Sequence, residues 1–458
     1  MNKLRADKEF YRTLAAVALP IALQSLISSS LTLVDNLMVG QLGESALSSV
    51  GLAIQIFHVQ WMVLFGFCTG CSTFTTQFWG VRDLRSIRKV AGLGMTTCVA
   101  VSAFFFLGAV AAPGFILRIF TDIPEAVASG SRYVRLAAPS FLFLAVTQPL
   151  SATFRATQQT KVPLYVSSFA FGLNTLLNYL LIFGHFGFPA MGIRGAALAT
   201  MISRMMECTL MLSMMLSRKN ILSGRLKDFF SFNLNFVRRV FRNATPTTVN
   251  EGLWGAADAA YNAAYGRLGI TAYAAVQASS TIMNLFAYAA FSVGDASLIL
   301  VGERLGRGDK EGALILSGKL IRVGITVGAV FGILMILLSG PILGLFELST
   351  HGIFLAGRVL LIKGLFLPLS MYIVIHITGT LRSGGDTKFA MFCEVGTMWL
   401  VGVPLAFLGA LYLNLPVYTV VLLVQAESLI KALILQKRYR SGKWLKNMIQ
   451  GMDEGGER

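Results

Sequence analysis

Residues 34–43 read VDNLMVGQLG, and residues 260–269 read AYNAAYGRLG. A shift of 226 residues lays the first stretch on the second and aligns Asn36 with Asn262, Gly40 with Gly266 and Gly43 with Gly269. The same shift aligns Pro20 with Pro246, Val50 with Val276, Gly80 with Gly306 and Asp83 with Asp309. Further along, a shift of 227 aligns Arg155 with Arg382, Thr160 with Thr387 and Lys161 with Lys388. A nearly constant offset through two loops indicates an internal duplication.

The composition places this duplicated chain in a membrane. Of its 458 residues, 55% are hydrophobic and only 13% are charged, whereas soluble domains carry about a quarter of charged residues. Apolar runs of helical length occur at about 14–38, 46–78, 87–112, 130–151, 163–184, 190–217, 241–265, 272–302, 314–340, 352–378, 388–411 and 415–436. Because the backbone must bond to itself in hydrocarbon, each run is predicted to be a helix.

The predicted fold is therefore an all-α integral membrane protein with twelve transmembrane helices in two six-helix bundles. Six is even, so both copies enter the membrane from the same side and the repeat is parallel. The expected boundaries are an N-terminal bundle at 1–217, a basic cytoplasmic linker at 218–240, a C-terminal bundle at 241–436 and a cytoplasmic tail at 437–458. Two bundles with a cavity between them are typical of alternating-access transporters.

The charge distribution predicts the orientation in the membrane. The net charge is +17, and most Lys and Arg residues fall on the side that holds the N-terminus. Basic loops stay on the cytoplasmic side, next to anionic lipid. We therefore expect a multi-pass, monomeric protein of the cytoplasmic (inner) membrane with both termini in the cytoplasm. The basic balance then reflects the lipid bilayer and predicts no nucleic-acid partner.

Several segments resemble one transporter family. They are Leu19-Pro20, the run 34–43, LNTLLNY at 173–179, MGIRGAALAT at 191–200, NEGLW at 250–254 and RSGGDT at 382–387. In this order, within a duplicated twelve-helix chain, they resemble the multidrug and toxic compound extrusion (MATE) transporters over nearly the whole length. The resemblance implies a V-shaped pair of bundles. It also implies export of small organic cations or amphipathic drugs, driven by inward flow of Na⁺ or H⁺ and with no other cofactor.

Asp35 is the first candidate for the coupling site. A carboxylate deep in a span costs about 2.5–3.5 kcal/mol on insertion scales, so it usually faces a cavity and marks an ion or proton path. The duplication places Tyr261 at the corresponding position, so the acid belongs to the N-terminal half alone. The alternative is that Asp35 only caps the end of its helix or bonds a backbone group.

Amide side chains lie near the same region of the sequence. Asn174 and Asn178 are four residues apart, so they project from one face of a helix. Carried over by the resemblance, a Na⁺ site uses Asp35, Asn174, Asn178, the backbone of Ala196 and the hydroxyl of Thr200. These are the hard oxygen ligands that Na⁺ takes. The alternative is that the amides form hydrogen bonds between helices.

The second half offers carboxylates of its own. Glu251 follows Pro246 by five residues, and the resemblance makes it a carboxylate for cation coupling or drug binding. Asp258 lies two turns on along nearly the same face, although it could equally be a helix-packing residue. Some relatives carry an acid where this chain has Met371, and Glu394 could stand in for it.

Other polar residues in the spans carry weaker signals. Gln55, Gln277 and Asn284 are expected to line the cleft because they lie in the second helix of each half. Arg204 and Glu207 are three residues apart and are expected to neutralise each other. Asp295 and Glu427 have no evident partner along the sequence, and the sequence predicts no role for them.

The cysteines and histidines predict no catalytic or metal site. Cys68 and Cys71 are spaced like a redox or metal pair, but no second pair or nearby His completes a site, so they are expected to be small core residues. The four His residues are scattered. An enzyme would need clustered catalytic groups, which the sequence does not offer. We therefore predict a transporter rather than an enzyme.

The leading function is a secondary active antiporter that works by alternating access. A flippase for a lipid-linked or other amphipathic substrate is the first alternative. It would line its cavity with Arg and Lys, whereas the charges inside these spans are mainly acidic. A channel lacks its expected filter loop or ring of like charges.

Overall fold

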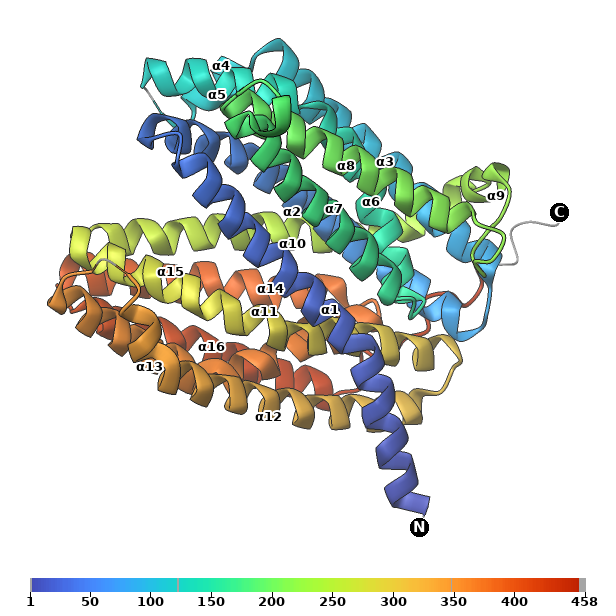
Figure 1. Ribbon diagram of the computed structural model, residues 1–458. Helices are drawn as coiled ribbons and strands as arrows, with labels where there is room; N and C mark the ends of the chain where they lie inside the picture. The colour runs from blue at the N-terminus through green and yellow to red at the C-terminus, as the bar shows by residue number, and fades with distance from the viewer. Residues whose placement is uncertain (1, 122, 347, 453–458) are drawn as a thin grey trace. The chain divides into compact units, whose positions relative to one another are not determined.

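The computed structural model describes residues 2–121, 123–346 and 348–452, and the regular elements in these ranges are all helices (Figure 1). The chain forms two compact units. The N-terminal unit consists of Leu23–Thr75 and Asp83–Phe241. The C-terminal unit combines Thr76–Arg82 with the described residues up to Ala22 and from Arg242 onward. The long helices α1 and α2 therefore each contribute to both units.

The described chain up to Phe230 forms nine α-helices and one short 3₁₀ turn, and all of them contribute at least in part to the N-terminal unit. They are α1 (Asn2–Gly40), α2 (Glu44–Gly80), α3 (Leu84–Ala111), α4 (Pro113–Arg118), α5 (Pro124–Ala137), α6 (Pro139–Ala156), α7 (Lys161–Phe183), η1 (His185–Gly187), α8 (Ile193–Leu216) and α9 (Leu226–Phe230). The rest of the described chain forms α10 (Leu234–Gly266), α11 (Ile270–Gly306), α12 (Lys310–Leu343), α13 (Thr350–Val374), η2 (Ile375–Leu381), α14 (Thr387–Thr397), η3 (Met398–Gly402), α15 (Val403–Phe407), η4 (Leu408–Tyr412) and α16 (Val417–Arg440).

The predicted number of spans is reached when the polar helices are included. In the described residues, nine helical segments are long and apolar enough to cross a membrane, and the bent pair α5 and α6 makes a tenth. The helices α8 and α10, of 24 and 33 residues, are also long enough to cross a membrane. They are less apolar because they carry the candidate acids and bases, among them Glu207 and Glu251. The all-α membrane fold is confirmed.

The N-terminal unit is built around α6 and α8. Helix α7 packs along α8, α6 lies against α3 and α8, and α5 contacts α8. The core between them contains Val39 from α1, Tyr133 from α5 and Ala196 from α8, each less than a tenth exposed. Burial of these apolar faces therefore brings the C-terminal part of α1 next to α5 and α8.

The C-terminal unit is a second helix bundle with its own cores. Helix α12 packs along α13, while α11 contacts both and α16 packs on α13 (Figure 1). Three segments, η2, η3 and η4, are π-helical. Such wider turns are uncommon and occur frequently at functional sites. The apolar pattern of the sequence does not reveal them, because segments of five to seven residues are too short to show a period of their own.

The repeated stretches form the same turn in both halves. Gly43 and Gly269 have φ angles of +102° and +101°, in a region that favours glycine. Their N–H groups donate to the carbonyls of Gly40 and Gly266, at 3.0 and 3.4 Å. The duplication read from the sequence is therefore also a duplication of backbone geometry.

The repeated aspartates cap helices. Asp83 accepts a hydrogen bond from the N–H of Ser86 at the start of α3, and Asp309 accepts one from Gly312 at the start of α12. This bond and the guanidinium of Arg304 hold the pKa of Asp309 below its usual value. The two loops are thus terminated by the same N-cap.

The segment that follows α16 packs into the C-terminal unit. Helix α16 ends at Arg440, and Trp444 beyond it is fully buried. The Trp444 indole stacks on Tyr439 with a centroid distance of 5.7 Å and donates to the Tyr439 carbonyl at 3.1 Å. The N–H of Met448 donates to Oε1 of Gln77 at 2.6 Å. This segment therefore connects α16 to the C-terminal end of α2.

Candidate functional site

The structure brings the predicted N-terminal residues together. Asp35 of α1 accepts a hydrogen bond at Oδ1 from Nδ2 of Asn178, at 2.8 Å, and this amide also lies 3.3 Å from Oδ1 of Asn174. With its amide turned so that the nitrogen faces the carboxylate, Asn174 donates to both Asp35 oxygens at 3.0 and 3.1 Å. Spans 1 and 5 thus meet at one acid and two amides.

The same place offers oxygen atoms for a cation. Oδ1 of Asn178 is buried and has no hydrogen-bond partner among the described residues. The Thr200 hydroxyl donates to the carbonyl of Ala196 at 3.0 Å, and its oxygen can still act as an acceptor or ligand. A buried acceptor without a donor costs free energy unless a proton donor or a cation satisfies it. The donor set of carboxylate, amide and hydroxyl oxygens fits Na⁺, and the carboxylate can also take a proton.

Sequence reasoning missed one residue of this site. Tyr133 of α5 is buried, hydrogen-bonds Thr200 and lies within electrostatic reach of Asp35. Its position could not be inferred from spacing, because α5 approaches α8 only through the bend between α5 and α6. The flanking residues gave no signal either, because Tyr133 lies between Arg132 and Arg135 in a polar stretch.

No basic side chain pairs with Asp35 in the described part of the chain. Arg204 is within electrostatic reach of Asp35, but its guanidinium contacts Glu207 at 2.7 Å, as predicted. Glu207 is held in turn by the hydroxyl of Ser167, which accepts from Gln24. Because Glu207 neutralises Arg204, the negative charge of the Asp35 carboxylate is left for a bound cation or a proton to neutralise.

The C-terminal carboxylates gather around one arginine. Arg382 is buried and donates to Glu251 at 2.8 Å, and Glu394 lies 4.0 Å away. Nδ2 of Asn250 donates to Glu394 at 2.9 Å, while Oδ1 of Asn250 is buried without a partner among the described residues. Two carboxylates on one guanidinium leave a formal charge of −1. Sequence reasoning named both acids but did not place Arg382 between them.

Asp258 belongs to a separate, exposed polar row. It accepts from Asn262 at 3.1 Å, and Gln277 donates to Asn262 at 3.4 Å. Lys363, which sequence reasoning did not single out, donates to Ser280 at 3.0 Å and lies within electrostatic reach of Asp258. The predicted lining residues Gln55 and Asn284 are exposed on α2 and α11.

Glu427 has a partner, contrary to the sequence-based expectation. Its carboxylate contacts the ammonium of Lys431, one helical turn further along α16. Its other oxygen accepts from the hydroxyl of Tyr261 at 2.6 Å. The spacing of four residues between Glu427 and Lys431 was a readable signal that had been overlooked.

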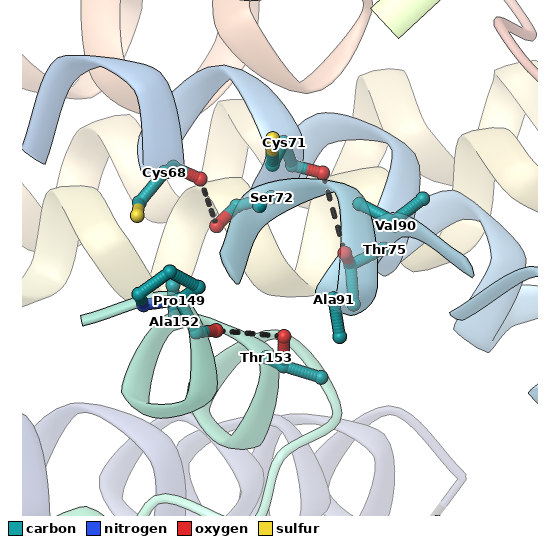
Figure 2. Close-up of a pocket in the computed structure, with 10 residues that line it drawn as sticks. Cys68, Cys71, Ser72, Thr75, Val90, Ala91, Pro149, Ala152 and Thr153 are labelled. Carbon is teal, nitrogen blue, oxygen red and sulfur yellow. Dashed lines mark hydrogen bonds between the residues drawn. The ribbon is translucent and has the colours of Figure 1, made fainter. Parts of the chain in front are cut away.

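The cysteines pack as core residues. Cys68 and Cys71 border a small cavity between α2, α3 and α6, and Figure 2 shows their sulfur atoms pointing in different directions. The sulfur of Cys68 lies 3.9 Å from that of Cys98 instead. Among the described residues, no group of three His, Cys, Asp or Glu side chains could hold a metal ion.

A family model described as MatE matches the chain twice, over residues 20–180 and 253–408. The chain belongs to the MATE family. The two matches fall on the two halves of the duplication, and together they cover most of the chain. The predicted family and the twelve-helix architecture are therefore confirmed, and the chain is a multi-pass membrane transporter.

Curated relatives of this MATE chain span nearly its full length. "Uncharacterized transporter YisQ" of Bacillus subtilis is 24% identical, with 97% of this chain and 96% of the relative covered. "Probable multidrug resistance protein NorM" of Thermotoga maritima is 25% identical, with 96% of this chain and 94% of the relative covered. These relatives are named as transporters or resistance proteins, and neither is named as an enzyme.

Solved structures share the fold of this MATE chain. One is the outward-facing conformation of a multidrug resistance MATE family transporter, with a TM-score of 0.85 at 16% identity over 94% of this chain and 96% of that one. Another is a transporter of the same superfamily from Pyrococcus furiosus, with a TM-score of 0.84, 17% identity and the same coverage. That protein is described as having a binding pocket of reversed polarity, which suggests a different function for it.

Proposed function

We propose that this protein is a secondary active antiporter that exports organic cations or amphipathic drugs in exchange for Na⁺ or H⁺. The observation that carries the proposal is the Asp35 carboxylate beside the buried, unpartnered Oδ1 of Asn178. Such an intramembrane acid marks an ion path. The protein is proposed to act as a monomer in the cytoplasmic membrane with both termini in the cytoplasm, since the basic loops are on that side.

Either ion would satisfy the same atoms. Na⁺ would take the Asp35 carboxylate, Oδ1 of Asn178 and the oxygens of Thr200 and Ala196 as ligands. A proton on Asp35 would instead convert the carboxylate into a hydrogen-bond donor. For antiport, the ion and the drug must favour opposite states of one conformational equilibrium.

The proposed substrate contacts lie in the C-terminal unit. Asp258 is exposed and surrounded by amides, so it suits the positive charge of an organic cation. Glu251 and Glu394 share one arginine and keep a net negative charge, which supports a role in drug binding or as a second cation site. Relatives named as probable multidrug resistance proteins also support this substrate class.

The flippase alternative gains no support from the basic residues. Arg204, Arg382 and Lys431 each contact a glutamate. A basic side chain paired in this way has less capacity to bind a pyrophosphate. Lys363, which donates to Ser280, is a basic residue that such a function could use.

Transport by the purified protein in proteoliposomes tests the proposal. The vesicles would hold a fluorescent organic cation, with a Na⁺ gradient or a pH gradient imposed separately. Wild type, Asp35→Asn and Glu251→Gln would be compared. We expect one gradient to drive export by the wild type and Asp35→Asn to abolish it.

The other results would change the account in defined ways. If only Glu251→Gln fails, coupling lies in the C-terminal unit and the assignment to Asp35 is wrong. If the wild type moves no cation under either gradient, the drug-export proposal falls. A lipid substrate would then have to be tested with Lys363→Gln.

A further inference from the structure

A second buried charge cluster in the C-terminal unit has no role in the proposed transport step. Glu427 and Lys431 are both 8% exposed at the side chain and face each other one turn apart on α16. The hydroxyl of Tyr261 on α10 donates to the free carboxylate oxygen at 2.6 Å. A Cβ at Gly402 in the π-helical segment η3 would lie 2.0 Å from that hydroxyl and 2.5 Å from Oε2 of Glu427. The cluster is therefore closely enclosed by three helices.

The cluster occupies the position of the Asp35 site in the repeat. Tyr261 is the repeat counterpart of Asp35. In the N-terminal unit, spans 1, 5 and 6 meet through Asp35, Asn178 and Thr200. In the C-terminal unit, the corresponding spans 7, 11 and 12 meet through Tyr261, Gly402 and Glu427. Each half thus places one carboxylate where its first, fifth and sixth spans converge.

The two halves differ in where the positive charge goes. In the N-terminal unit the basic residue of span 6, Arg204, is neutralised by Glu207, so Asp35 is left without a cation. In the C-terminal unit the basic residue of span 12, Lys431, contacts the carboxylate of the cluster itself. The formal charge of the C-terminal cluster is therefore zero, whereas the N-terminal site is negative.

We infer that Glu427 and Tyr261 form a second monovalent-cation site whose cation is the tethered ammonium of Lys431. The ammonium takes the place that a Na⁺ would take, so this half binds no exchangeable ion at the cluster. Of these two repeat-related positions, only the one in the N-terminal unit, where the cation is not covalently attached, then exchanges an ion. The comparison with Asp35 rests on the proposed function, but the chemistry at Glu427 stands independently of it.

Removal of the tethered charge tests the inference. Lys431→Met keeps the length of the side chain but leaves the carboxylate without a cation. Binding of radioactive Na⁺ to the purified full-length protein would be measured at about pH 8 in the Asp35→Asn background, which removes the N-terminal carboxylate. We expect Asp35→Asn/Lys431→Met to bind about one Na⁺ per molecule more than Asp35→Asn. Its affinity for Na⁺ should be at least tenfold higher than that of Asp35→Asn.

Two controls separate this site from an ordinary ion pair. Adding Glu427→Gln should remove the gained Na⁺, and Lys431→Arg, which keeps a tethered cation, should gain none. Equal Na⁺ binding with and without Lys431→Met, in protein that elutes as one sharp peak on size exclusion, would overturn the inference. If Asp35→Asn alone binds as much Na⁺ as the wild type, the proposed N-terminal site fails, but the gain caused by Lys431→Met still decides this inference.

Discussion

Nδ2 of Asn178 donates to Oδ1 of Asp35 across 2.8 Å, while the oxygen of the same amide is buried with no partner in the described structure. One side chain thus supplies a donor to the charged acid and an unsatisfied acceptor beside it. A purely structural hydrogen bond between helices has no need for the second feature. Bound Na⁺ or a proton on Asp35 would complete the arrangement.

Replacement of Asn178 by Ala should weaken ion binding more than folding. Hydrogen bonds to charged groups are worth about 1.5–3 kcal/mol, so the ion concentration for half-maximal transport should rise about tenfold or more. Transport at varied ion concentration would measure this. Ser168→Ala on the same helix is the matched control, because its hydroxyl bonds only the Leu164 carbonyl. An unchanged half-maximal concentration in Asn178→Ala would exclude the amide from the site.

Glu207→Gln should leave Asp35 neutralised by a covalently attached cation, Arg204, as Lys431 neutralises Glu427 in the C-terminal unit. Without Glu207, the guanidinium of Arg204 is free to neutralise Asp35. Apparent ion affinity should fall about tenfold, which corresponds to about 1.4 kcal/mol of coupling. The double variant Arg204→Gln/Glu207→Gln should regain most of the affinity. If the double variant is as weak as Glu207→Gln, the arginine does not act on Asp35.

Gly402→Ala should destabilise the protein because the new methyl group collides with the Tyr261 hydroxyl. Overpacking of this kind costs about 1–3 kcal/mol, which thermal unfolding in detergent would detect. Tyr261→Phe in the same background should recover part of the loss, since it removes the colliding atom. Gly396→Ala is the control, because a Cβ there meets nothing within 4 Å. Equal unfolding temperatures for the two alanine variants would contradict the close packing of the cluster.

Trp444→Ala should destabilise the C-terminal unit, although Trp444 lies beyond the last span. The side chain is fully buried against a core that includes Leu435 and Leu381. Loss of a buried Trp costs about 3–5 kcal/mol, whereas Lys443→Ala on the exposed side of the same segment should stay within about 0.5 kcal/mol. A similar unfolding temperature for both variants would show that the segment does not stabilise the unit.

Features that repeat along the chain could be predicted from the sequence. The offset of 226 residues identified the duplication, and the structure shows it again as the same turn at Gly43 and Gly269. Spacing by four residues placed Asn174 and Asn178 on one face, and the structure brings both to Asp35. Helical periodicity and duplication are local or regular properties, so a single sequence is enough to reveal them.

Contacts that depend on packing between distant helices could not be predicted in this way. Tyr133 reaches Thr200 through the bend between α5 and α6, and Arg382 lies between Glu251 and Glu394 from three different helices. The π-helical segment η3, which places Gly402 at the cluster, is too short to be seen in the apolar pattern of the sequence. The pair Glu427 and Lys431 is different, since its spacing was visible and was overlooked.

If the coupling ion acts through Asp35 to expel the substrate, it must lower the affinity for the substrate only when Asp35 is present. The affinity of the purified protein for a fluorescent organic cation would be measured with and without Na⁺ at about pH 8 and then as the pH is lowered. Coupling between sites typically changes affinity about 5–150-fold. We expect one of the two ions to lower the affinity of the wild type within this range and to leave that of Asp35→Asn unchanged. The same ion-dependent loss of affinity in Asp35→Asn would contradict it.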